Sequence, residues 1–173
     1  MKSLKPYSIP FTGLKAGNHA FSFDVNDSFF AEFPYSLVKK GALVCRLDLE
    51  KKENLLILDL HITGKIALSC DRCLAEFLHP VDVREQQIAK FSDEDMEDAD
   101  EEIIVLGKND TEIDISPIIY ELVNISVPFV STCGSEGNTE FCNREMLDKL
   151  SRLSGQEEEK GNDPRWDALK NLK

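Results

Sequence analysis

The amino-acid sequence predicts an α+β domain, in which an antiparallel β-sheet that could close into a barrel is followed by short helices toward the C-terminus. Apolar and polar residues alternate over most of residues 43–68, which is the two-residue period of a strand with one buried face. Over residues 116–123 and 143–153, apolar residues instead recur every three or four positions, as in an amphipathic helix. With 173 residues and 42% hydrophobic content, the chain is long enough to bury one real core.

The centre of the predicted sheet is a hairpin that starts at Gly41 and turns at residues 51–54. Its first strand places alternate residues on one inward face, namely Leu43, Cys45, Leu47 and Leu49. Its second strand does the same with Leu56, Leu58, Leu60, Ile62, Ile66 and Leu68. Gly64 predicts a bulge or a bend. Another extended segment follows and runs to about Ile88, broken or turned near Pro80.

Shorter elements flank this meander. Residues 20–25 predict a strand, residues 7–11 a further edge strand, and residues 103–106 and 112–115 two short strands. Three helix starts carry a capping residue: Asn26 before a cluster of phenylalanines, Ser116 with a proline behind it, and Asn143.

The chain is predicted to form a single domain over residues 1–153, with a polar linker at 154–162 and a short helix at 163–173 that contains Trp166. Eight of the ten residues from 93 to 102 are acidic. Because these charges repel one another and the segment has little apolar surface, residues 92–102 are predicted to be a mobile acidic loop.

Net charge is −12, and almost all of it belongs to the second half of the chain. Residues 1–80 hold ten Lys/Arg against nine Asp/Glu, whereas residues 81–173 hold ten against twenty-three, so the halves carry +1 and −13. Such a surface repels phosphate backbones and attracts basic proteins. We therefore expect a partner with a basic surface, and no DNA.

The sequence has neither the apolar run of a signal peptide at its start nor eighteen consecutive uncharged apolar residues anywhere. It therefore predicts a cytoplasmic protein with no membrane partner. In that reducing compartment, cysteines are expected as thiols, metal ligands or redox groups rather than as structural disulfides.

Four of the five cysteines are candidate metal ligands: Cys70, Cys73, Cys133 and Cys142. The C-x-x-C spacing lets one tight turn aim two thiolates at one ion, and a second pair would complete the tetrahedral shell of a structural zinc. Eight residues separate Cys133 from Cys142, which is longer than a standard knuckle. His79 is a candidate substitute ligand. The alternative interpretation is that these residues are ordinary reduced thiols.

Cys45 lies on an inward strand face and is interpreted as a core residue. A C-x-x-C motif also suggests a thiol oxidoreductase, but there it normally follows a strand and opens a helix. Here Cys70 and Cys73 fall between two predicted strands. The sequence has no glycine-rich phosphate loop, nucleophile elbow or histidine-rich metal motif, so no catalytic residue is predicted and the protein is not expected to be an enzyme.

Three segments together resemble one known family. Residues 62–77 contain a strand that enters Cys-Asp-Arg-Cys-Leu, and residues 113–128 contain Ile-Asp-Ile, a helix and Val-Pro. Residues 163–169 read Asp-Pro-Arg-Trp-Asp-Ala-Leu. In this order and spacing, they resemble the bacterial and plastid family of large ribosomal RNA subunit accumulation proteins, over most of residues 40–172.

The resemblance implies a factor that supports accumulation or processing of 23S rRNA and ribosome biogenesis, and it implies no known chemical activity. Together with the lack of catalytic motifs, it leads us to expect a non-enzymatic factor. With the charge distribution, it favours action through a ribosomal protein or assembly factor with a basic surface. The alternative is direct binding of 23S rRNA, for which the near-neutral first half offers Lys39, Lys40, Lys51, Lys52 and Arg72 as phosphate contacts. A thiol-based redox enzyme is a third hypothesis.

Overall fold

A computed structural model describes residues 5–91, 103–107, 109–134, 140 and 142–154. Five strands form one sheet in the order β2 (Gly17–Val25), β3 (Gly41–Lys51), β4 (Leu55–Ser69), β5 (Glu76–Phe91) and β6 (Ile103–Leu106). The first four strands are antiparallel, whereas β6 runs parallel to β5. A second, two-stranded sheet pairs β1 (Ser8–Ile9) with β7 (Ile113–Asp114).

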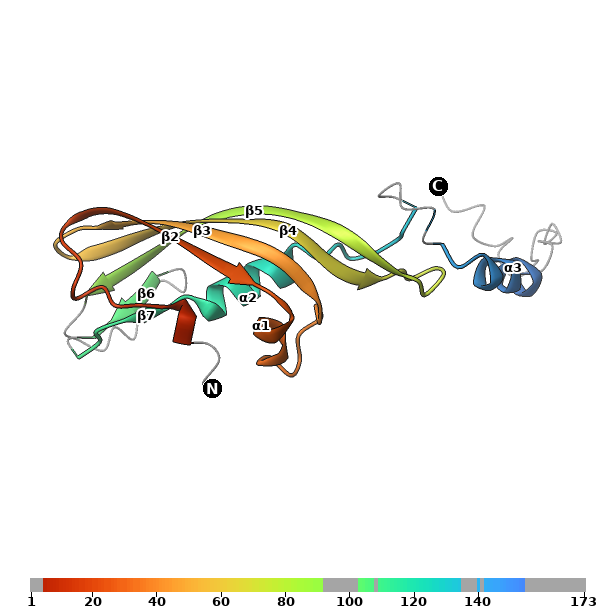
Figure 1. Cartoon of the computed structure of the whole chain (residues 1–173), viewed down its shortest axis with the longest axis horizontal. Coiled ribbons are helices and arrows are strands. Elements are labelled where there is room, and N and C mark those ends of the chain that lie inside the picture. The colour runs from red at the N-terminus through yellow and green to blue at the C-terminus, as the bar shows by residue number, and fades with distance from the viewer. Residues whose placement is uncertain (1–4, 92–102, 108, 135–139, 141, 155–173) are drawn as a thin grey trace, which may run out of the picture.

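The sheet arches over helix α2 (Ser116–Ile125), with the short helix α1 (Asp27–Ala31) beside it (Figure 1). The predicted α+β class and mainly antiparallel sheet are confirmed. Among the described strands, β2 and β6 are the outermost of five, so this sheet is open and does not close into a barrel.

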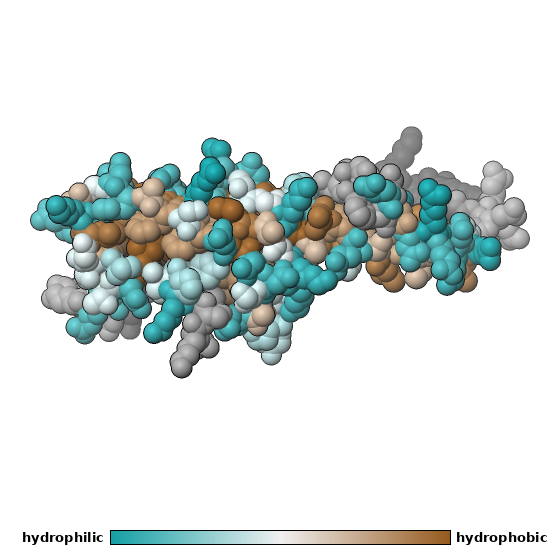
Figure 2. Space-filling view, viewed as in Figure 1, coloured by the Kyte–Doolittle hydropathy of each residue, from teal (hydrophilic) through white to brown (hydrophobic). Residues whose placement is uncertain are grey.

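The core lies between the concave face of the sheet and these helices. All the inward residues predicted for the central hairpin are buried there. They pack with Phe29 and Phe30 of α1 and with Ile119 and Val123 of α2. Figure 2 shows apolar residues gathered along the middle of the body, with polar residues above and below them in this view. None of the described helices is both long enough and apolar enough to cross a membrane.

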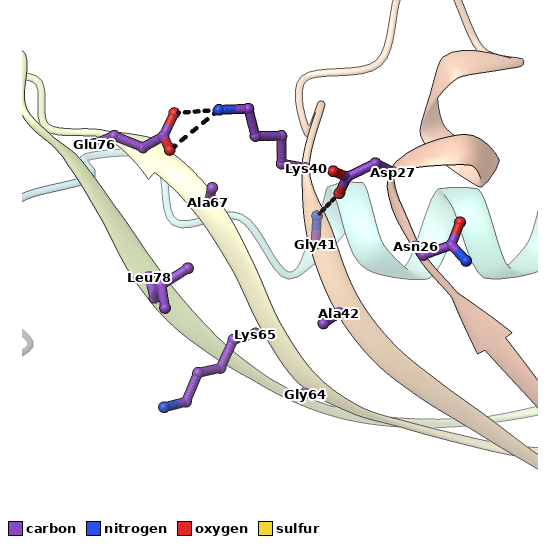
Figure 3. Close-up of a pocket in the computed structure, with 10 residues that line it drawn as sticks. All are labelled: Asn26, Asp27, Lys40, Gly41, Ala42, Gly64, Lys65, Ala67, Glu76 and Leu78. Carbon is purple, nitrogen blue, oxygen red and sulfur yellow. Dashed lines mark hydrogen bonds and ion pairs between the residues drawn. The ribbon is translucent and has the colours of Figure 1, made fainter.

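Gly64 lies in the middle of β4, where β3 comes unusually close. Its φ is +148°, a conformation that side chains disfavour. A Cβ added there would lie 2.6 Å from the Cα of Leu43 and would also collide with the carbonyl oxygen of Ala42. Pairing continues without interruption on both sides of Leu43 and Gly64, which excludes a bulge. By having no side chain, Gly64 therefore allows β3 and β4 to approach each other closely; Figure 3 shows it near Ala42.

The predicted break near Pro80 is wrong, because β5 continues through it and Pro80 pairs with Lys65 of β4. The parallel partner β6 reaches only Ile88–Phe91. At Pro80 the other edge of β5 therefore has no described partner strand, and open edge positions tolerate a residue that lacks an N–H.

The helix caps agree with the prediction in two of three places. Asn26 accepts a hydrogen bond from the Ser28 N–H at 3.0 Å, and Asn143 accepts one from the Met146 N–H at 3.2 Å at the start of α3 (Arg144–Leu153). In α2, Ser116 is the first helical residue rather than the cap, and its N–H donates to Asp114 at 2.9 Å. The acidic loop at 92–102, the linker from residue 155 on and the helix at 163–173 lie outside the described residues.

Lys51 holds the N-terminal segment against the end of the sheet. Its Nζ donates to the carbonyl oxygens of Phe11 at 2.7 Å and Leu14 at 2.8 Å. The neighbouring Lys52 instead forms an exposed ion pair with Glu50 at 3.2 Å. Lys51 is thus occupied within the fold, and it is a poor candidate for the phosphate contact that the sequence suggested.

Replacing Lys51 with methionine is expected to lower the free energy of unfolding by about 1–3 kcal/mol, because two carbonyl groups lose a charged donor. The control, Lys52→Met, should cost less than about 1 kcal/mol, as exposed ion pairs contribute little. Urea denaturation measures both. Equal midpoints for the two variants would contradict the structural role given to Lys51.

Candidate metal centre

The first cysteine pair forms a tight turn between β4 and β5, which is the strand-to-strand position that the sequence predicts. The Cys70 N–H donates to the Ala75 carbonyl at 2.8 Å, and the Leu74 N–H donates to the Cys70 carbonyl at 2.9 Å. The Cys73 N–H points at the Cys70 Sγ, 3.5 Å away. Leu74 completes the turn with a φ of +59°, rare for a leucine. The backbone thus wraps around the Cys70 sulfur.

The loop that follows α2 is attached to this turn by a second set of hydrogen bonds. The Asp71 N–H donates to the Ser131 carbonyl at 2.8 Å, and the Asp71 carboxylate accepts from the Ser131 N–H at 2.7 Å. The Cys133 N–H reaches the Cys70 Sγ at 3.5 Å. Residues about sixty positions apart are thereby held together. Sequence reasoning missed Asp71 and Ser131.

These two segments bring the four predicted cysteines into one sulfur cluster. The Sγ atoms of Cys70, Cys73 and Cys133 all lie within 4.8 Å of one another, and all three residues are buried. Cys73 and Cys133 are 3.6 Å apart. Cys142 is partly exposed and extends the cluster through Cys133, with a sulfur separation of 2.9 Å.

The donor set fits a thiophilic metal ion. Zn–S bonds of about 2.3 Å imply sulfur separations of about 3.8 Å in a regular tetrahedron, close to the observed Cys73–Cys133 distance. Cys133 and Cys142 are closer than that, so an ion would require the Cys142 sulfur to move outward. The cluster could therefore hold a metal.

Hydrogen bonds and charge control the acidity of these thiols. Burial raises the pKa of Cys70, but backbone N–H groups of Cys133, Cys73 and Arg72 outweigh it and bring the pKa down to about 6. The thiol of Cys133 hydrogen-bonds to Cys142, which raises the pKa of Cys133 and lowers that of Cys142. Arg72 beside Cys142 further lowers the Cys142 pKa. Thiolates, the metal-binding form, are thus favoured on both sides of the cluster.

The other two residues weighed as ligands or thiols lie elsewhere. Cys45 is fully buried in β3, where burial raises its pKa to about 12, so it is a core thiol as predicted. His79 sits in β5 opposite Ile66. Within the described part of the chain, the potential ligands that all lie within 4.8 Å of one another are Cys70, Cys73 and Cys133, and His79 is not among them.

A shallow cavity of about 740 Å³ on the outer face of the sheet is a weaker candidate (Figure 3). Its floor is made of small residues of β3 and β4. At its rim, Lys40 is paired with Glu76 at 3.2 Å, and Asp27 accepts from the Gly41 N–H at 2.9 Å. Because these charged groups already have partners within the protein, the sulfur cluster is the stronger candidate site.

Comparison with known proteins places these features in a family context. The family model described as large ribosomal RNA subunit accumulation protein YceD matches residues 58–173, which include both cysteine pairs. The uncharacterized protein YlbN of Bacillus subtilis is 29% identical over 128 residues, covering 73% of this chain and 70% of its own length. No solved structure matches the chain.

Proposed function

Because the chain belongs to the family of large ribosomal RNA subunit accumulation proteins, we propose that it supports 23S rRNA accumulation and ribosome biogenesis as a non-enzymatic factor that acts through protein contacts. The family match covers more than half of the chain. Membership gives the chain a role in accumulation of large-subunit rRNA. The partner class, the absence of catalysis and the role of the cysteines are the proposed parts.

The proposal of protein contacts rests on the exposure of helix α3. It lies beyond the end of the sheet, past the β4–β5 turn (Figure 1), and none of its residues is buried. Its sequence is nevertheless strongly amphipathic, and its apolar residues include Leu150, 42% exposed, and Leu153, 83% exposed. Only the start of this apolar face is covered, where Leu147 packs against the core, and an apolar face that is exposed toward its end is typical of a protein-binding element.

Charge supports a basic partner. Residues 81–173 carry a formal charge of −13, which favours a basic ribosomal protein or assembly factor over a phosphate backbone. Several candidate phosphate contacts are also used within the fold. Lys51 binds backbone carbonyls, Lys40 pairs with Glu76, and Lys52 pairs with Glu50.

We propose that the sulfur cluster holds a structural zinc through Cys70, Cys73, Cys133 and Cys142. Structural zinc sites are closed and four-coordinate, four thiolates being one of their common ligand sets, and they contribute directly to folding stability. Such an ion would tie the β4–β5 turn to the loop that leads into α3. It would thereby fix where α3 leaves the body, while Arg72 would offset part of the negative charge of four thiolates.

Affinity purification from the native host tests the proposal of protein contacts. We expect the tagged full-length protein to retain a basic ribosomal protein or assembly factor after RNase treatment and to release it as salt is raised, because salt screens charge attraction. Leu153→Asp should weaken this retention. Ser151→Asp is the matched control, since it adds the same charge to an exposed residue of the same helix outside the apolar stripe.

If RNase removes all retained protein, direct rRNA binding becomes the better explanation. If Leu153→Asp and Ser151→Asp retain the partner equally well, α3 is not the contact element.

A further inference from the structure

The four cysteines of the cluster differ in their access to solvent. Cys70, Cys73 and Cys133 are fully buried, whereas Cys142 is partly exposed. The sulfur nearest to Cys142 is that of Cys133, at 2.9 Å. An oxidant that arrives from solvent therefore meets Cys142 first, with Cys133 directly behind it.

We propose that Cys142 and Cys133 form a peroxide-sensitive pair. Its oxidation to a disulfide would remove two ligands from the proposed zinc site and release the segment between Cys133 and α3. This inference rests on the proposed zinc site for its effect on the metal. The disulfide itself requires only the two cysteines and a hydroperoxide.

The chemistry proceeds in two steps. The Cys142 sulfur attacks one oxygen of hydrogen peroxide, the O–O bond breaks, and Cys142 becomes a sulfenic acid while the second oxygen leaves as water. The Cys133 sulfur then attacks the Cys142 sulfur, so that an S–S bond forms and the S–O bond breaks to give a second water. Two sulfurs together lose the two electrons that reduce the peroxide. Overall, one peroxide and four protons convert the zinc tetrathiolate into a disulfide, two thiols, free Zn²⁺ and two waters.

The disulfide would remove two of the four ligands and leave only the Cys70–Cys73 pair. Two thiols of one turn are a poor zinc site, because structural zinc takes four ligands. The Asp71–Ser131 hydrogen bonds do not involve sulfur, so the loop would stay attached at Ser131. Cys133 and Cys142 would instead be bonded to each other, and α3 would no longer be linked through the metal to the β4–β5 turn.

Treatment of the full-length zinc-loaded protein with hydrogen peroxide tests this proposal. We expect one zinc released for each disulfide formed, as read with a chelating dye, and peptide mapping should locate the disulfide at Cys133–Cys142 with Cys45 unmodified. Dithiothreitol with added zinc should restore the loaded protein. Cys142→Ser cannot form this disulfide, and it should slow peroxide-driven oxidation of the remaining cluster thiols by roughly tenfold or more, because the exposed sulfur is missing.

The same mapping on reduced, metal-free protein separates this inference from the zinc proposal. If the protein binds no zinc but still forms the Cys133–Cys142 disulfide, the zinc proposal fails and the redox pair stands. If peroxide yields a Cys70–Cys73 disulfide, or only sulfinic and sulfonic acids, the redox pair is overturned whether or not zinc is bound.

Discussion

A host strain whose only copy of this protein carries Cys70→Ser should show a 23S to 16S rRNA ratio as low as that of a strain lacking the protein. Cys70 is the residue on which the turn and the second loop converge, because its sulfur accepts from the N–H groups of both Cys73 and Cys133. Without it, the proposed zinc loses a ligand at the centre of the site, and the segment leading to α3 loses its anchor. RNA electrophoresis or quantitative sequencing measures the ratio.

Cys45→Ala is the matched control for that experiment. It also removes a fully buried cysteine, but one that lies in β3 and outside the cluster. Strains carrying it should keep the normal rRNA ratio, provided that immunoblotting shows equal amounts of the two variants. A normal amount of 23S rRNA in the Cys70→Ser strain, at a normal protein level, would show that the sulfur cluster is not needed for 23S rRNA accumulation.

Replacing Gly64 with alanine should lower the free energy of unfolding by about 2–4 kcal/mol, as a strained conformation and overpacking add together. The new Cβ would meet backbone atoms of β3 rather than a flexible side chain, so it could be accommodated only by moving two paired strands. Since one or two kcal/mol is already a large part of the stability of a domain, part of the variant could unfold at the growth temperature. Guanidinium or thermal denaturation measures the loss.

Gly13→Ala is the control, because a Cβ at Gly13 has no atom within 4 Å and the residue is exposed. We expect it to change stability by no more than about 0.5 kcal/mol, as is usual for surface substitutions. If the two alanine variants unfold at the same midpoint, β3 and β4 are not as closely packed at Gly64 as described.

The central strands could be predicted because one face of each is buried and alternation records that face directly. Leu47 and Leu49 show this period between the charged residues at positions 46, 48 and 50, and both are buried. The path of β5 through Pro80 was mispredicted because local propensity does not reveal that the strand has an open edge there. Whether the sheet closes also depends on which strands pair at its edges, and alternation carries no information about that.

The cysteine ligands of the candidate site could be predicted from their spacing in the sequence. The backbone hydrogen bonds and conformation that hold these cysteines together could not. The C-x-x-C turn, together with a second pair, indicates a sulfur cluster before any fold is known. The two hydrogen bonds between Asp71 and Ser131 could not be predicted, since both are common polar residues sixty positions apart. Nor does a leucine at position 74 signal a φ of +59°, because a glycine or asparagine is the usual marker of that conformation.

Elemental analysis of the full-length protein, purified without chelator, tests the proposed zinc site most directly. We expect about one zinc for each chain, and a loss of that zinc in Cys70→Ser but not in Cys45→Ala. Less than about a tenth of an equivalent of zinc in the wild-type protein, remaining so after incubation with added zinc, would contradict this expectation.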